Sequence, residues 1–152
     1  MGLDMYLEKE IFVGGQYEHR GVSGKLEYTS NNKHYSIPAK RISFVCLPMG
    51  YWRKANAIHK WFVDNVQNEE DDCKKHYVSL EDLKELKTLC KEVLEDHNKA
   101  EELLPSKSGF FFGGTDYDEY YFKDLEDTIK IVDYCLEDEL NYSGDFWYQS
   151  SW

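Results

Sequence analysis

Residues 3–13 read LDMYLEKEIFV. Leu3, Met5 and Leu7 alternate with charged or aromatic residues, which is the two-residue period of a strand that buries one face. We therefore expect one strand over residues 3–13, or two strands with a kink between them, and the glycine pair at 14–15 then marks a turn. Because a strand needs partners, the segments that follow decide which sheet it joins.

Several later segments also have the composition of strands. They are Lys25–Thr29, His34–Ile37, Ile42–Leu47, Gly109–Phe112 and residues 146–152. The first two flank the polar residues 30–33, which is typical of a β-hairpin. Pro48 and Gly50 follow the third, which we expect to be a central strand that ends there. We expect the last strand to return to the first sheet.

Three segments have helical spacing. We expect helices over Tyr51–Gln67, from Ser79 toward Pro105, and over Asp118–Leu140. Ser79 followed by Asp82 resembles a helix-capping arrangement. The predicted fold class is α+β: a single domain with a mostly antiparallel sheet from the N-terminal strands plus a C-terminal strand, packed by about three helices.

The charge is distributed unevenly along the 152 residues. The net charge is −11, but residues 1–60 carry nine Lys or Arg against five Asp or Glu, whereas residues 61–152 carry nine against 24. Such asymmetry predicts a bipolar surface. The acidic part would repel nucleic-acid backbones, so direct nucleic-acid binding is not expected. Solvated acidic helix faces explain the same pattern.

The composition also indicates where in the cell the protein is expected. No run approaches the roughly 20 apolar residues of a membrane helix, and the start MGLDMYLEKE lacks the features of a signal peptide. We expect a cytoplasmic protein with no membrane partner. The four cysteines form no C-x-x-C pair. A zinc site that joins Cys73 and His76 to Cys90 and His97 has unsuitable spacing, so no metal and no cofactor is expected.

The segment YWRKANAIHKWF, residues 51–62, is the first candidate site. On a helix, Trp52, Asn56 and His59 lie along one stripe, and Arg53 lies beside it. With Tyr51, such a face can stack on a planar base and bind its phosphate. Alternatively, the aromatic residues pack on the sheet, the histidine bonds a core group and the arginine pairs with a carboxylate.

The segment SGFFFGGTDYDEYYF, residues 108–122, is the second. Gly113 and Gly114 precede a helix start, where free N–H groups bind anions. The carboxylates Asp116 and Asp118 at that start suit the positive end of the helix dipole, but they repel an anion. The alternative is a turn followed by an N-terminal cap. The spacing matches neither a phosphate loop nor a calcium loop.

No known catalytic motif is present. The sequence contains no G-x-S-x-G and no H-E-x-x-H. Asp116 and Glu119 can in principle act as an acid and base pair. Paired carboxylates are nevertheless common at acidic helix starts, so the sequence favours a protein that is not an enzyme.

Four blocks carry a resemblance to known sequences. MGLDMYL, YWRKANAIHKWFV, SGFFFGGTDYDEYY and the terminal YQSSW resemble an uncharacterised family of small proteins encoded in bacteriophage and prophage genomes. The resemblance spans most of the chain and implies a phage setting inside a host cell. It implies no reaction type.

These observations leave three functions open. The first is a phage-encoded binding protein that counteracts a host defence system by sequestering a nucleotide-like ligand. The second is an acidic inhibitor that imitates nucleic acid and binds a host protein. The third is a small enzyme that acts on a nucleotide or sugar phosphate through Asp116, Asp118 or Glu119. Formation of a homo-oligomer is left open.

Overall fold

A computed structural model describes residues 2–152 of the chain. The elements in chain order are β1 (Asp4–Phe12), η1 (Glu18–Arg20), β2 (Lys25–Ser30), β3 (Lys33–Pro38), η2 (Ala39–Arg41), β4 (Phe44–Arg53), α1 (Asn56–Asn65), β5 (His76–Val78), α2 (Leu80–Glu95), η3 (His97–Lys99), α3 (Ala100–Leu103), α4 (Glu119–Glu139) and β6 (Asp145–Ser151). Within residues 2–152, four of these elements are α-helices and three are short 3-10 helices.

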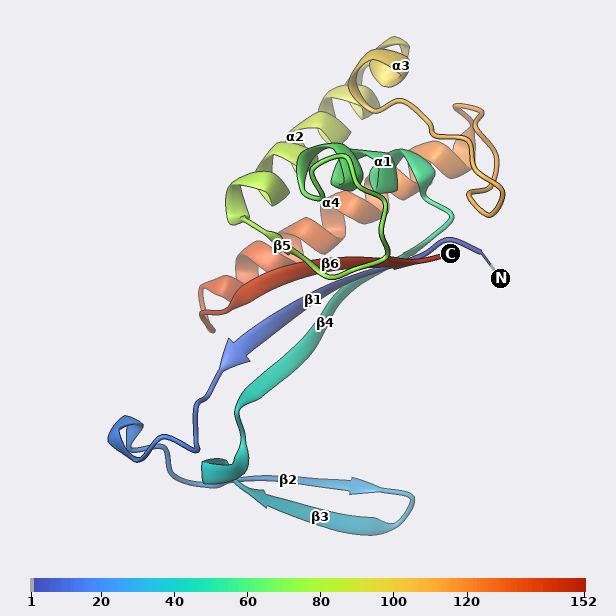
Figure 1. The fold of residues 1–152 in the computed structure, drawn as a ribbon. Coiled ribbons are helices and arrows are strands. Elements are labelled where there is room, and N and C mark those ends of the chain that lie inside the picture. The colour runs from blue at the N-terminus through green and yellow to red at the C-terminus, as the bar shows by residue number, and fades with distance from the viewer. Residues whose placement is uncertain (1) are drawn as a thin grey trace.

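The main sheet has four strands in the order β4-β1-β6-β5, and all its pairings are antiparallel. The strand over residues 3–13 is therefore an inner strand, and the C-terminal strand returns beside it. The helices lie over one face of this sheet (Figure 1). The predicted α+β class is confirmed.

In residues 2–152, no helix has the length and apolar content to cross a membrane.

The core lies between this sheet and the helices. Met5 and Leu7 point from β1 into it, and Phe62 of α1 stacks on Tyr148 of β6 at 3.9 Å between ring centroids. The buried Lys9 is the exception on β1. Its Nζ lies 3.0 Å from Asp138 and 2.8 Å from Glu139 at the end of α4. Burial opposes the charge of this lysine, but the hydrogen bonds with both carboxylates outweigh burial and raise its pKa.

Strands β2 and β3 form a separate two-stranded sheet. They are the predicted hairpin, and Asn31 and Asn32 adopt positive φ in its two-residue turn, as such tight turns require. Figure 1 shows the hairpin projecting from the end of β1 and β4, on the far side from the helices.

The predicted helix over Tyr51–Gln67 starts too early. Tyr51, Trp52 and Arg53 belong to β4, which pairs with β1 as far as Asp4 opposite Arg53. Here Trp52 points inward and its neighbours point outward, the two-residue period of a strand. The helical spacing of Trp52 and Ala55 was misleading, because sheet pairing decides the local structure.

The expectation that a central strand ends at Pro48 and Gly50 is also wrong. β4 is an edge strand, where a proline removes no ladder hydrogen bond, and a bulge between Leu7 and Glu8 adjusts the register there. Position 50 is occupied by glycine, which has no side chain, and helix α4 packs closely against it. A Cβ at this position would lie 2.4 Å from Cγ2 of Ile131.

Other boundaries follow the predictions more closely. The Ser79 cap is confirmed: its Oγ accepts from Asp82 N at 3.0 Å, and Asp82 accepts from Ser79 N at 2.9 Å. The helix expected over Asp118–Leu140 is α4. The predicted strand Gly109–Phe112 is instead a turn, in which Phe112 N donates to Gly109 O. The short β5 and α3 were not predicted, because neither is long enough to show a period.

Candidate functional site

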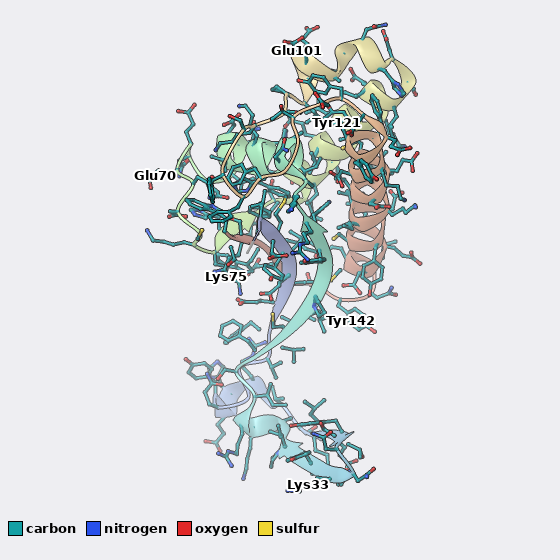
Figure 2. The ribbon with its side chains drawn as sticks, turned by 90° about the vertical axis from the view of Figure 1, so that its right-hand side faces the viewer. Lys33, Glu70, Lys75, Glu101, Tyr121 and Tyr142 are labelled. Carbon is teal, nitrogen blue, oxygen red and sulfur yellow. The ribbon has the colours of Figure 1, made fainter. Side chains whose placement is uncertain are left out.

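A cavity of about 320 Å³ opens where β4 passes into α1. The loop over residues 105–118 and the first turns of α4 form its other walls, so Tyr121 in Figure 2 marks its α4 side. Six of the residues predicted from the sequence line it: Arg53, Asn56, Gly113, Gly114, Asp116 and Asp118. The structure thus brings together the end of one candidate segment and the glycine turn of the other.

Lys54 makes the sharp connection between strand and helix. Its φ of 59° is left-handed, an uncommon conformation for a residue with a side chain. Lys54 N donates to Leu3 O at 2.8 Å, and Asn56 N donates back to Lys54 O at 2.9 Å. The opposite wall follows this turn closely, because Gly113, also at positive φ, leaves room for the Lys54 stem.

Asn56 holds the cavity wall together. Its Nδ2 donates to Phe112 O at 3.0 Å and to Gly114 O at 2.7 Å, and its Oδ1 accepts from Lys107 N at 3.0 Å. The side chain is 5 % exposed. Its amide is thus occupied by the loop, so Asn56 holds residues 107–114 against the start of α1.

One wall of the cavity is acidic. Asp118 is the N-cap of α4, and its Oδ1 accepts from Tyr120 N and Tyr121 N, both at 3.1 Å. The cap that the sequence left as an alternative is therefore present. Asp124 lies one to two turns further along α4. Burial, followed by the nearby charges of Asp127 and Asp118, raises the pKa of Asp124 to about 7.

The facing wall offers donors. Arg53 has 60 % of its side chain exposed, and its closest carboxylate, that of Asp4, lies 3.9 Å from Nε. Lys54 lies beside it on the same wall. Ala55 stands at the N-cap position of α1 and supplies no side-chain cap. Asn56 N is bonded to Lys54 O, and Ala57 and Ile58 of the first turn also line the cavity, so the positive end of the α1 dipole lies at this wall.

Two of the predicted site residues, Tyr51 and Trp52, do not line the cavity. Trp52 is 4 % exposed, and its Nε1 donates to Thr128 Oγ1 of α4 at 2.8 Å. Tyr51 points to the other face of the sheet, where its hydroxyl donates to Asp4. Alternate residues of a strand point to opposite faces, so Tyr51 and Trp52 point apart. Arg53 lies on the side of Tyr51, beside Asp4, and borders the cavity at the end of the strand.

His59 is also placed elsewhere, in the core. It has no exposed surface. Its Nε2 lies 2.9 Å from Asp71 Oδ2 and its Nδ1 lies 2.7 Å from Tyr148 Oη. Burial lowers the pKa of His59, against the hydrogen bond with Asp71, so the ring is neutral: Nε2 donates to Asp71 and Nδ1 accepts from Tyr148. His59 therefore lies outside the cavity, away from the predicted site residues that line it.

Several residues of the cavity were not predicted from the sequence. They are Lys54, Ser106, Tyr120, Tyr121 and Asp124. A signal existed for Asp124, because it follows Tyr121 by three residues and precedes Leu125 on the buried stripe of α4, which turns it inward. The position of Ser106 could not be predicted, because it lies in a loop whose sequence has no regular period.

Neither metal chemistry nor known proteins add to this picture. Across residues 2–152, no group of three or more His, Cys, Asp or Glu side chains is placed to hold a metal ion. Comparisons with protein-family models, curated proteins and solved structures gave no match to this chain.

Proposed function

We propose that this chain is a non-catalytic binding protein for a small nucleotide-like molecule, which occupies the cavity at the start of α1. The observation that carries the proposal is the opposition of charge across the cavity. Arg53, Lys54 and the α1 N-terminus line one wall, and Asp118 and Asp124 line the other. A ligand with an anionic group at one end and N–H donors at the other satisfies both walls.

The size and surface of the cavity narrow the ligand class. Its volume of about 320 Å³ is at the low end for small-molecule sites, so it accommodates one mononucleotide. Tyr120, which lines the cavity and is 73 % exposed, offers an aromatic face to a base. A carboxylate accepts two N–H bonds side by side, so Asp124 favours a base with adjacent donors, as on the edge of guanine.

A thermal-shift titration with guanosine 5′-monophosphate tests the proposal, with adenosine 5′-monophosphate as the matched probe. A ligand that binds only the folded state raises the midpoint of unfolding. We expect the guanine nucleotide to raise it more, and the Arg53→Gln and Asp124→Asn variants to lose most of the shift. Glu137→Gln, an equal charge change on the same helix away from the cavity, should retain it. Absence of a shift with either nucleotide at millimolar concentration contradicts the proposal.

One observation favours a second function. A carboxyl group whose pKa is near neutral, inside a cavity, suits general acid–base chemistry on a nucleotide or sugar phosphate. The sequence pointed to Asp116, Asp118 and Glu119 for this role, whereas the geometry favours Asp124. Chromatography of the nucleotide after incubation separates the two functions: an unchanged nucleotide supports binding alone, and a product that Asp124→Asn fails to form supports the enzyme.

The resemblance to phage-encoded proteins supplies the proposed role for such binding. A protein that holds a nucleotide stoichiometrically lowers its free concentration in the host cell. We therefore propose that the chain counteracts a host defence system by withdrawing a nucleotide signal. Co-purification of a nucleotide with protein from infected host cells tests this role.

A further inference from the structure

Residues 13–43, called the arm below, have almost no core of their own. They comprise the β2–β3 hairpin with η1 and η2. All residues from 16 to 38 are exposed except Val22 and Ile37, which are half-buried. Figure 2 places Lys33, at the hairpin turn, at the far end of the molecule from Tyr121. Because an isolated two-stranded hairpin is at best marginally stable in water, a partner that covers it is expected.

The arm is apolar on one face only. The register pairs Leu26 with Ile37 and Tyr28 with Tyr35, and these four side chains, the apolar arm face, share one side of the hairpin. The two tyrosine rings stack at 5.0 Å between centroids. Leu26, Tyr28 and Tyr35 are 47 %, 45 % and 41 % exposed. The other side is polar, with Lys25, Glu27, Thr29, His34 and Ser36. An uncovered face of this kind marks an interaction surface.

The charge of the arm indicates what covers it. The arm carries five Lys or Arg against two Glu, which is a net charge of +3. Because the whole chain carries a net charge of −11, the remainder of the chain carries −14. The cationic residues are Arg20, Lys25, Lys33, Lys40 and Arg41. A basic arm and a strongly acidic body are complementary when the arm of one copy meets the body of another.

The body also has a matching uncovered surface. The helices cover one face of the main sheet, as Figure 1 shows. The opposite face presents Tyr6, Tyr51, Tyr77 and Trp147, called the open sheet face below. The tyrosines are 40 %, 52 % and 54 % exposed. Glu8 and Glu10 lie on the same side of β1 as Tyr6, and Lys75 pairs with both of them, so this face carries two carboxylates and one cation at its centre. A two-stranded sheet can pack face to face on such a surface.

We propose that the apolar arm face docks on the open sheet face of a second copy of this chain, and that the exchange is reciprocal. A two-fold axis then relates two equivalent contacts, each between one arm and one body. Tyrosine-rich surfaces are typical of the centres of protein interfaces. The opposite charges orient the two copies, and arm-to-arm pairing is disfavoured because both arms are basic.

Sedimentation equilibrium of the full chain tests the proposal. The wild type is expected to be a dimer whose dissociation constant rises with salt. Leu26→Lys on the apolar arm face and Tyr77→Lys on the open sheet face should each raise that constant at least about tenfold. Thr29→Lys adds the same charge to the polar side of the hairpin and should raise it less than about threefold. The midpoint of thermal unfolding of each variant at high dilution confirms that the body is folded.

A mixing experiment distinguishes this exchange from other dimers. Leu26→Lys and Tyr77→Lys copies each lose both contacts alone, but a mixture retains one intact contact, between the wild-type arm of one copy and the wild-type open sheet face of the other. We expect mixed dimers at concentrations where each variant alone is monomeric. A wild-type protein that is monomeric at about 100 µM overturns the proposal. So does a mixture that remains monomeric, or an arm that binds only nucleic acid.

Discussion

The Asp124→Asn variant tests the electrostatics of the cavity through protein stability. The pKa of this carboxyl is 3.8 in the unfolded chain and about 7 in the folded protein. Between these values the folded state holds a proton that the unfolded state has released, so the stability contributed by this group is present below about pH 4 and is lost as the pH rises toward 7. Asparagine has nearly the same shape and no charge, so it removes this dependence.

The size of the effect follows from the pKa. A difference of about three pH units corresponds to a ceiling of about 4 kcal/mol, at ~1.4 kcal/mol per unit. Asp124 lies in an open cavity, where solvent screens its neighbours, so we expect about 1–2 kcal/mol. The variant should therefore be more stable than the wild type at pH 8, by a margin that shrinks toward pH 5.

Urea unfolding at a series of pH values from 5 to 8 measures this margin. Glu137→Gln serves as the control, because it removes one carboxylate from the same helix outside the cavity. Its free energy of unfolding should run parallel to that of the wild type. A constant margin for Asp124→Asn across the series, or a variant less stable than the wild type at pH 8, would show that Asp124 does not hold a raised pKa in the folded protein.

Three further perturbations address the packing of the sheet against α4 and the loop at the cavity. Lys9→Met leaves two partly buried carboxylates without their cation and should lower the free energy of unfolding by about 3 kcal/mol in urea titrations; a loss below about 1 kcal/mol contradicts this. Gly50→Ala forces a methyl group against Ile131 and should cost about 1–3 kcal/mol, a cost that Ile131→Ala largely relieves in a double-mutant cycle. Asn56→Ala breaks the bonds that hold the loop and should accelerate hydrogen exchange over residues 106–114, whereas unchanged exchange would remove its positioning role.

The sequence predicted those parts of the fold that depend on local pattern. The alternation in residues 3–13, the Ser79 cap and the long stripe of α4 each depend on neighbours within a few residues, and the structure has all three. Tyr51 and Trp52 show where such reasoning fails. Their conformation as part of a strand depends on pairing with residues almost 50 positions earlier in the chain, and no local period reveals this pairing.

The candidate site divides in the same way. Arg53, Gly113 and Gly114 were found because residue types that suit ligands clustered in sequence, and long-range folding then placed the two clusters together. His59 belonged to the same pattern, but a carboxylate and a hydroxyl from distant segments satisfy it within the core. Asp124 was overlooked because its chemistry arises from burial and from neighbouring charges, which a sequence does not display.

Nuclear magnetic resonance titration of the full chain with guanosine 5′-monophosphate tests the proposed site most directly. We expect the amide signals of Ala57, Gly113 and Gly114 to shift in a saturable manner, while the indole signal of Trp52 stays in place. Shifts confined to the arm, or signals that do not move at millimolar nucleotide, would contradict the assignment of the cavity as the binding site.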